Sequence, residues 1–317
     1  MDKNEARTEC KRLFSTKTLE DSLDLLEIYL KFFFRVIKNH HEEEVYSYAD
    51  RDAKMVIQMM FTKVAHIKRV LSGIEFYSEE GVTLNKIIDP TTVGVLIRNI
   101  YETVAMFNLI YRRTKSEEEK MILYNLWVHS GLKYRQRFEV VATTQESKGK
   151  LNSEKKQIKQ LISEIENTEL YKNLLPKEKA KIQTKIKEKD YKICFSEEKV
   201  LFLSWQEITS EMELGNDLLD NIYTYFSLYS HPSNVAVFQF SEMFDKGEEP
   251  FKYMTNYNLR NMFILLSIFI ADYINLFPSV LDTFNKLSII DQIAIDFQNR
   301  FMRGDNFAIN DAWSKLE

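Results

Sequence analysis

Two ionisable residues one helical turn apart, Arg98 and Glu102, give the strongest indication of chemistry in this sequence. They lie in an almost wholly apolar stretch at residues 91–111, TTVGVLIRNIYETVAMFNLIY. A helix this apolar is expected to be buried, and a buried charge is costly unless it is paired. Arg98 has the chemistry to bind an anion, and Glu102 can act as an acid or a base. The alternative is a structural ion pair that bridges helices.

The neighbours of this pair widen the polar stripe. Asn99 and Thr103 each follow one of the two charged residues directly, and Tyr101 lies between them. Arginine before glutamate is the less favourable order for an ion pair within one helix. We therefore expect both charged groups to find partners on other helices, and Asn99 and Tyr101 are candidate ligand-binding residues.

A second polar segment, SLYSHPSN at residues 227–234, supplies a third candidate catalytic residue, His231. Histidine titrates near neutral pH, so it suits proton transfer. Pro232 disfavours a helical conformation at the preceding residue, which predicts that a helix ends at His231. His231 would then either cap that helix or face Arg98 and Glu102 across a cleft. The further candidate ligand-binding residues of the segment are Ser227, Ser230 and Asn234.

Together the two motifs resemble a family of bacterial all-helical proteins that has no assigned reaction. The resemblance rests on LIRNIYE at residues 96–102 and SLYSHPS at residues 227–233. Members of that family carry an Arg-and-Glu helix and a late Ser-x-x-Ser-His-Pro helix end, and they are associated with mobile elements and with abortive infection or phage defence. The resemblance spans Asp50 to Leu276. It implies that Arg98, Glu102 and His231 share one site in a binding or interaction protein of such a system.

A rival resemblance is to the helical ribonucleases of toxin and defence systems, which carry an Arg-x(4–6)-His motif. Arg35 and His40 have this spacing, in RVIKNH. Chance matches are expected in a chain with 13 Arg and 5 His, and Val36 replaces the polar residue usual after the arginine. No arginine stands at the required spacings before His231. The alternative function is therefore a metal-independent ribonuclease, or another hydrolase of a toxin or abortive-infection system.

Motifs for metals and cofactors are missing from the sequence. The run HHEEE at residues 40–44 has no recognised metal-ligand spacing and predicts a solvated helix end. The chain contains no Gly-rich phosphate loop, no Cys-x-x-Cys and no nucleophile elbow. We expect no metal and no cofactor.

Long helices must position these groups. The chain has only 8 Gly and 5 Pro, far below the usual roughly 7% and 5% that tight turns require. Asp89, Pro90 and two threonines form a helix start signal before the apolar stretch. Apolar periodicity predicts helices at residues 19–38, 50–71, 91–113, 117–141, 214–230, 255–276 and 279–301, with a loop at 244–250. The predicted fold class is all-α, a multi-helix and mostly antiparallel bundle.

A Lys-rich segment interrupts the core-like composition. Residues 148–192 contain 13 Lys, no Arg and 7 acidic residues. Isoleucines and leucines recur there at helical spacing, and Pro176 marks a bend, which predicts an inserted, charged helical hairpin. The expected domains are 1–147, the N-terminal part of the core, 148–192, the hairpin, and 193–317, the C-terminal part. The hairpin is a candidate contact for nucleic acid or a protein partner, although the absence of Arg weakens base reading.

Composition and charge limit the remaining possibilities. The formal net charge of −4 gives no global bias toward nucleic acid. The two cysteines, Cys10 and Cys194, suggest a reducing cytoplasm. The charged N-terminus lacks the apolar region of a signal peptide, and the longest apolar run, at residues 262–270, is too short to span a bilayer. We expect a bacterial cytoplasmic protein without membrane contact, and a homo-oligomer is compatible with the sequence.

Overall fold

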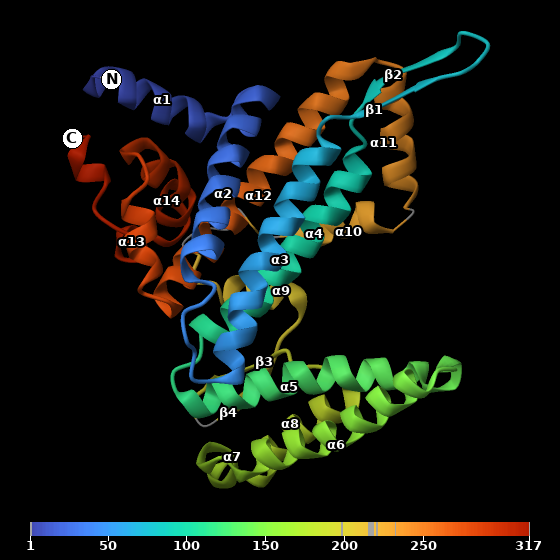
Figure 1. The fold of residues 1–317 in the computed structure, drawn as a ribbon, viewed down its shortest axis with the longest axis vertical. Coiled ribbons are helices and arrows are strands. Elements are labelled where there is room, and N and C mark those ends of the chain that lie inside the picture. The colour runs from blue at the N-terminus through green and yellow to red at the C-terminus, as the bar shows by residue number, and fades with distance from the viewer. Residues whose placement is uncertain (1, 198, 215–218, 220, 232, 317) are drawn as a thin grey trace. The chain divides into compact units, whose positions relative to one another are not determined.

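A computed structural model describes residues 2–316 of the chain, apart from residues 198, 215–218, 220 and 232 (Figure 1). The described residues form fourteen α-helices and two short two-stranded antiparallel sheets, which confirms the predicted all-α, multi-helix fold. The chain divides into two compact units. Unit 1 comprises residues 1–108 and 213–317, and unit 2 comprises residues 109–212. The domain boundaries expected at 147/148 and 192/193 both fall inside unit 2.

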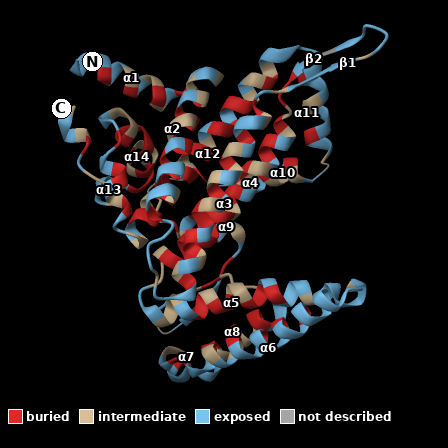
Figure 2. Cartoon of the chain, in the orientation of Figure 1, coloured by how far each residue is buried: buried red, intermediate tan, exposed pale blue. Residues whose placement is uncertain are grey.

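Unit 1 is built around two long apolar helices, α4 and α12, that pack against each other. Helices α3 and α10 also pack on α4, whereas α2 and α14 pack on α12. Buried residues gather along the contacts of these helices (Figure 2). The elements of unit 1 are α1 (Lys3–Ser15), α2 (Leu19–His40), α3 (Tyr48–Val70), β1 (Ile74–Tyr77), β2 (Thr83–Ile87), α4 (Pro90–Phe107), α10 (Ile222–Ser230), α11 (Asn234–Phe244), α12 (Glu248–Leu276), α13 (Val280–Asn285) and α14 (Ile289–Arg303).

Helix α4 begins where the start signal predicts and lies unusually close to α10. Asp89 accepts a 2.9 Å hydrogen bond from the backbone N–H of Thr91, and Pro90 opens the helix. A β-carbon built on Gly94 would lie 3.1 Å from Cβ of Tyr229, which is tighter than nine in ten real contacts of a β-carbon. The missing side chain of Gly94 therefore lets the α10 backbone approach α4, which brings the polar residues of α10 beside Arg98.

A buried ion pair joins α12 to α14. Arg303 Nη1 donates to Asp272 Oδ1 at 2.7 Å, and Nη2 donates to Oδ2 at 3.1 Å. The side chains of Arg303 and Asp272 are 0% and 2% exposed. Asn108 Nδ2 donates a further 2.7 Å hydrogen bond to Asp272. An almost wholly apolar helix can hold this carboxylate because a bidentate guanidinium and an amide replace its water.

The structure corrects the sequence prediction at several elements of unit 1. The loop predicted at 244–250 is wrong, because α12 already begins at Glu248. Pro250 lies in the first turn, where the backbone N–H groups have no partner within the helix. Helices α1 and α11 and the β1–β2 hairpin were not predicted. Within the helix predicted at 214–230, residues 215–218 and 220 lie outside the described residues, and α10 ends at Ser230 as expected.

Two helices of the described chain are, by length and hydropathy alone, able to cross a membrane. They are Pro90–Arg112, which is α4 with the π-helical turn that follows it, and α12. The sequence did not predict either of them as a membrane span, because polar residues interrupt the apolar run of each helix. In the structure 72% and 67% of their most apolar windows are buried against other parts of the protein, and core helices of soluble proteins pass the same test.

Unit 2 contains the Lys-rich segment. Residues 148–192 span most of α6, all of α7 and α8, and the loop that follows, and Pro176 opens α8. Leu132 of α5 packs with Ile158 and Leu161 of α6 in a small buried cluster, so the hairpin shares its core with α5. The elements of unit 2 are the π-helical turn at Asn108–Arg112, α5 (Glu117–Arg135), a 3-10 helix (Gln136–Val141), α6 (Gln145–Asn167), α7 (Glu169–Asn173), α8 (Pro176–Glu188), β3 (Ile193–Ser196), β4 (Lys199–Phe202) and α9 (Trp205–Ser210).

Candidate functional site

Helix α4 presents the Arg98–Glu102 pair at the edge of unit 1. Arg98 Nε donates to Glu102 Oε1 at 3.1 Å, and the two side chains are 20% and 30% exposed. The pair is therefore only partly desolvated. An ion pair of this exposure contributes little to stability, typically below about 1 kcal/mol. A ligand can bind only where solvent reaches, and this pair is partly exposed to solvent.

Arg98 also reaches across to α10, as its order before Glu102 led us to expect. Its Nη2 donates to the hydroxyl of Tyr223 at 2.7 Å, and its Cζ lies 4.8 Å from the centre of the Tyr223 ring. The Tyr223 ring is supported by Tyr101, whose ring centre is 5.5 Å away. Glu102 and Tyr223 thus hold the guanidinium from two sides, so little side-chain entropy remains to be lost when a ligand binds.

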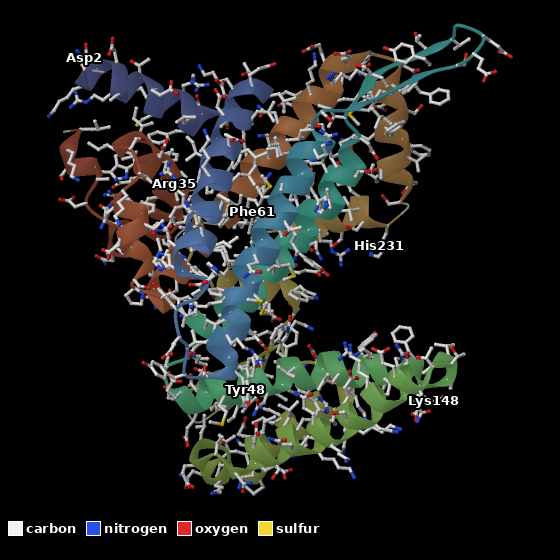
Figure 3. All side chains as sticks on the ribbon, viewed as in Figure 1. Asp2, Arg35, Tyr48, Phe61, Lys148 and His231 are labelled. Atoms are coloured by element: carbon white, nitrogen blue, oxygen red, sulfur yellow. The ribbon has the colours of Figure 1, made fainter. Side chains whose placement is uncertain are left out.

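His231 lies beside the remaining edge of the guanidinium. It follows α10 directly, has an extended backbone (φ −116°, ψ 148°), and is exposed (Figure 3). Its Nε2 is 3.5 Å from Arg98 Nη1. Arginine can only donate, so this contact requires a lone pair on Nε2 and the proton on Nδ1. At 3.5 Å the hydrogen bond is long and weak, and an anion can displace it.

A lysine that the sequence did not point to lies near Glu102. Lys63 of α3 donates a hydrogen bond to Thr103 Oγ1, next to Glu102. Burial lowers the pKa of Lys63 to about 8, and the charge of Glu102 opposes this shift. The centre therefore combines two cations with one carboxylate and one titratable imidazole. Its net charge is positive at neutral pH, which favours anions.

The candidate ligand-binding residues lie in different environments. Asn99 is exposed on α4, and Asn234 is exposed at the start of α11. Tyr101 is 0% exposed and packs in the core. The hydroxyl groups of two serines donate to carbonyl groups of their own helix, Ser227 to Tyr223 at 2.7 Å and Ser230 to Phe226 at 3.0 Å. The structure thus brings Arg98, Glu102 and His231 together, while ligand binding by these other residues stays a prediction.

The ribonuclease-like pair Arg35 and His40 does not form a site. The two residues are five apart on α2, so their side chains point in different directions. Arg35 is exposed, whereas His40 is buried between Glu43 and Thr283. The prediction of a solvated helix end at residues 40–44 is therefore wrong for His40. Its ring holds the end of α2 against α13.

Metal ligands do not converge in the described part of the chain. No group of three or more His, Cys, Asp or Glu side chains there is placed to hold a metal ion. Cys10 and Cys194 are both free thiols. Burial raises the pKa of each to about 11, so neither is a ready nucleophile at neutral pH.

Fold and site define an all-helical protein with a solvent-reachable, arginine-centred cluster between α4 and α10. The chain belongs to the DUF5677 family, a family of unknown function whose model matches residues 77–249. This confirms the resemblance to a family without an assigned reaction, while the link to mobile elements stays a prediction. The matched range includes Arg98, Glu102, Tyr223 and His231 but not Lys63. Comparison with curated proteins and with solved structures finds no match.

Replacing Lys63 with methionine should raise the free energy of unfolding at pH 7, by about 1 kcal/mol after allowance for partial exposure. The pKa of Lys63 is about 8 in the folded chain and ordinarily 10.5. The unfolded chain therefore binds the proton more tightly between pH 8 and 10.5, and the cost of the charge disappears as pH rises through that window. Urea unfolding at pH 7 and pH 10 measures this. If Lys63→Met raised the free energy of unfolding equally at pH 7 and pH 10, burial of the Lys63 charge would not be the cause.

Proposed function

We propose that unit 1 binds a phosphate-bearing anion at the centre formed by Arg98, Tyr223 and His231. One observation carries the proposal: Glu102 and Tyr223 hold the Arg98 guanidinium in place, while its Nη1 contacts only the exposed ring of His231 within the described residues. Donors fixed in a plane match the oxygens of phosphate, which arginine binds in a bidentate manner.

The charges around Arg98 support a phosphate ester over a neutral ligand. Glu102 cancels one positive charge, but Lys63 keeps most of its proton at pH 7 because its pKa is about 8. A ligand with two or more negative charges would therefore gain most from this centre, and its binding should weaken as salt rises.

The biological setting that we propose is a bacterial defence or mobile-element system, in which this protein serves as a binding or interaction component. The resemblance of residues 96–102 and 227–233 to proteins of such systems supports this setting. A nucleotide or a nucleic acid end would be a suitable ligand there, because both carry phosphate groups. Loss of phage protection in cells that carry Arg98→Ala, at unchanged protein level, would be the corresponding cellular result.

A second candidate function, metal-independent hydrolysis of RNA, is favoured by the position of His231 Nε2 beside Arg98. In this reaction the imidazole takes the proton of a ribose 2′-hydroxyl, whose oxygen bonds to phosphorus, and the guanidinium binds the oxyanion that forms there. The bond from phosphorus to the 5′-oxygen then breaks, and that oxygen leaves with a proton returned by the imidazole. Incubation of labelled RNA with the protein in EDTA tests this candidate. Cleavage by the parent protein but not by His231→Asn would favour it, and intact RNA with both would exclude it.

The Lys-rich hairpin of unit 2 is proposed as a second contact for a polyanion or an acidic protein partner. Lys148, Lys150, Lys156 and Lys159 are exposed on α6. None of these four makes an ion pair among the described residues, whereas Lys155 pairs with Glu139. Changing three of them to glutamine should lower the salt slope of RNA binding by about 2 if they contact phosphates.

Titration calorimetry with inorganic pyrophosphate, a mononucleotide and a short single-stranded RNA tests the main proposal. We expect saturable binding of at least one of these ligands, stronger at about 50 mM than at about 200 mM salt. The Arg98→Ala variant should lose it. If no phosphate ligand binds the parent protein, or if binding is unchanged in Arg98→Ala, the proposal fails.

A further inference from the structure

Helix α11 exposes an apolar face that the rest of the described structure leaves uncovered. Its inner face packs in the core through Ala236 and Met243. Its outer face carries four large apolar residues, Val235, Val237, Phe238 and Phe244, which are 45%, 58%, 64% and 49% exposed. The outer face of α11 also contrasts with the buried contacts of α4 and α12 in Figure 2. A helix that is apolar on both faces normally has both faces covered.

A groove adjoins this face. It has a volume of about 560 Å³ and lies between α11 and the start of α12. Met243, Pro250, Tyr253 and Met254 supply its apolar lining, and Tyr253 is 77% exposed. Methionine side chains adapt to differently shaped partners. Together with the outer face of α11, the groove makes a set of neighbouring exposed apolar side chains, and large patches of this kind usually mark an interaction site.

The charged residues around the groove are four acids and two lysines, Lys246 in its wall and Lys252 beside it, so acidic charge is in excess. Glu242 lies in its wall and Asp245 follows α11, and neither makes an ion pair among the described residues. Glu248 and Glu249 share the single cation Lys252, so they are only partly neutralised. An anionic lipid surface would be repelled by these carboxylates. A second copy docked face to face would place acid against acid.

We propose that the outer face of α11 and the α11–α12 groove dock an amphipathic helical segment of a partner protein whose apolar stripe is flanked by Lys or Arg. The apolar stripe of such a segment would cover Phe238 and enter the groove beside Tyr253. Its basic flanks would pair with Glu242 and Asp245. This is the helix-in-groove mode of peptide recognition, in which apolar anchors give affinity and charges set the choice of partner.

Fluorescence anisotropy with two synthetic peptides of about 18 residues, or five helical turns, tests the proposal. Both peptides carry the same leucine stripe, flanked by lysine in one and by glutamate in the other. The parent protein should bind the lysine-flanked peptide at least about tenfold more tightly. The charge-reversed variant Glu242→Lys/Asp245→Lys should invert this preference.

Variants of the apolar face make the test specific. Phe238→Glu should weaken binding of the lysine-flanked peptide by about tenfold or more. Phe301→Glu is the matched control, because Phe301 is 59% exposed on α14, outside the patch; it should leave binding unchanged. Equal binding of both peptides by the parent, or equal losses in the two phenylalanine variants, would overturn the proposal. So would light scattering that shows a dimer abolished by Phe238→Glu, or equal binding of anionic vesicles by the parent and the charge-reversed variant.

Discussion

Replacing Arg98 by alanine should weaken pyrophosphate binding by about ten- to hundredfold, because charge-assisted hydrogen bonds contribute about 1.5 to 3 kcal/mol. Arg98→Lys should recover only part of this loss. A lysine keeps the charge, but it cannot contact Glu102, Tyr223 and a phosphate at once in the planar arrangement that Arg98 adopts. Calorimetry with pyrophosphate on the parent protein, Arg98→Lys and Arg98→Ala, at one salt concentration, measures the three affinities, which should fall in that order.

Replacing Arg98 by alanine should lower the free energy of unfolding only slightly. The Arg98–Glu102 pair is partly exposed, so its loss together with the Tyr223 contact should lower the free energy of unfolding by about 1 kcal/mol. Arg300→Ala is the matched control, since Arg300 is 22% exposed, pairs with Asp305 and lies over the Trp313 ring. It should lose similar stability but no pyrophosphate affinity. Equal affinity losses in both variants would show that the Arg98 effect is not specific.

The Arg303→Met substitution should be far more destabilising, by about 3 to 5 kcal/mol. It removes a guanidinium that is 0% exposed and leaves the carboxylate of Asp272 buried without its bidentate partner. The hydrogen bond from Asn108 to Asp272 remains, but it is too weak to replace the lost cation. Urea unfolding at pH 7 measures the loss.

The double variant Arg303→Met/Asp272→Leu tests the cause of that loss. The double variant does not leave either member of this pair buried without the other, so it should be more stable than Arg303→Met alone. If the double variant instead lost as much free energy of unfolding as the two single variants added together, lost packing between α12 and α14 would be the cause.

The contrast between the two arginines explains which ion pair is structural. Arg303 and Asp272 are sealed in the core and satisfy each other, so their pair belongs to the fold. Arg98 lies in an equally apolar helix, yet it is placed at the edge of unit 1, with an aromatic support and an exposed histidine. This position is the one that the proposed anion site requires.

Local signals in the sequence predicted the helices that carry the site. Asp89 and Pro90 mark the start of α4, the four-residue spacing puts Arg98 and Glu102 on one face, and α10 ends before His231 as expected. These features depend on neighbours along the chain. The apolar lengths of α4 and α12 likewise predicted a helical core.

Features that depend on tertiary contacts were not predicted. Tyr223 is one of several tyrosines in an aromatic run, and Lys63 is one of three lysines on a mixed helix. Only the close approach of α10 and α3 to α4 makes them neighbours of Arg98 and Thr103. The same reason hid the role of Asp272, which sequence alone shows only as a polar interruption of an apolar run. Helix α11 escaped notice because apolar residues on both faces blur its periodicity.

Side-chain NMR during a pyrophosphate titration tests the central claim most directly. The chain has five histidines and 13 arginines, so the ring signals of His231 and the Nε–H signal of Arg98 can be assigned by substitution. We predict that both signals shift in a saturable way with one common Kd, while the Nε–H signal of Arg300 does not move. Shifts confined to signals outside the Arg98 centre, or no saturable shift at all, would contradict a ligand site at Arg98.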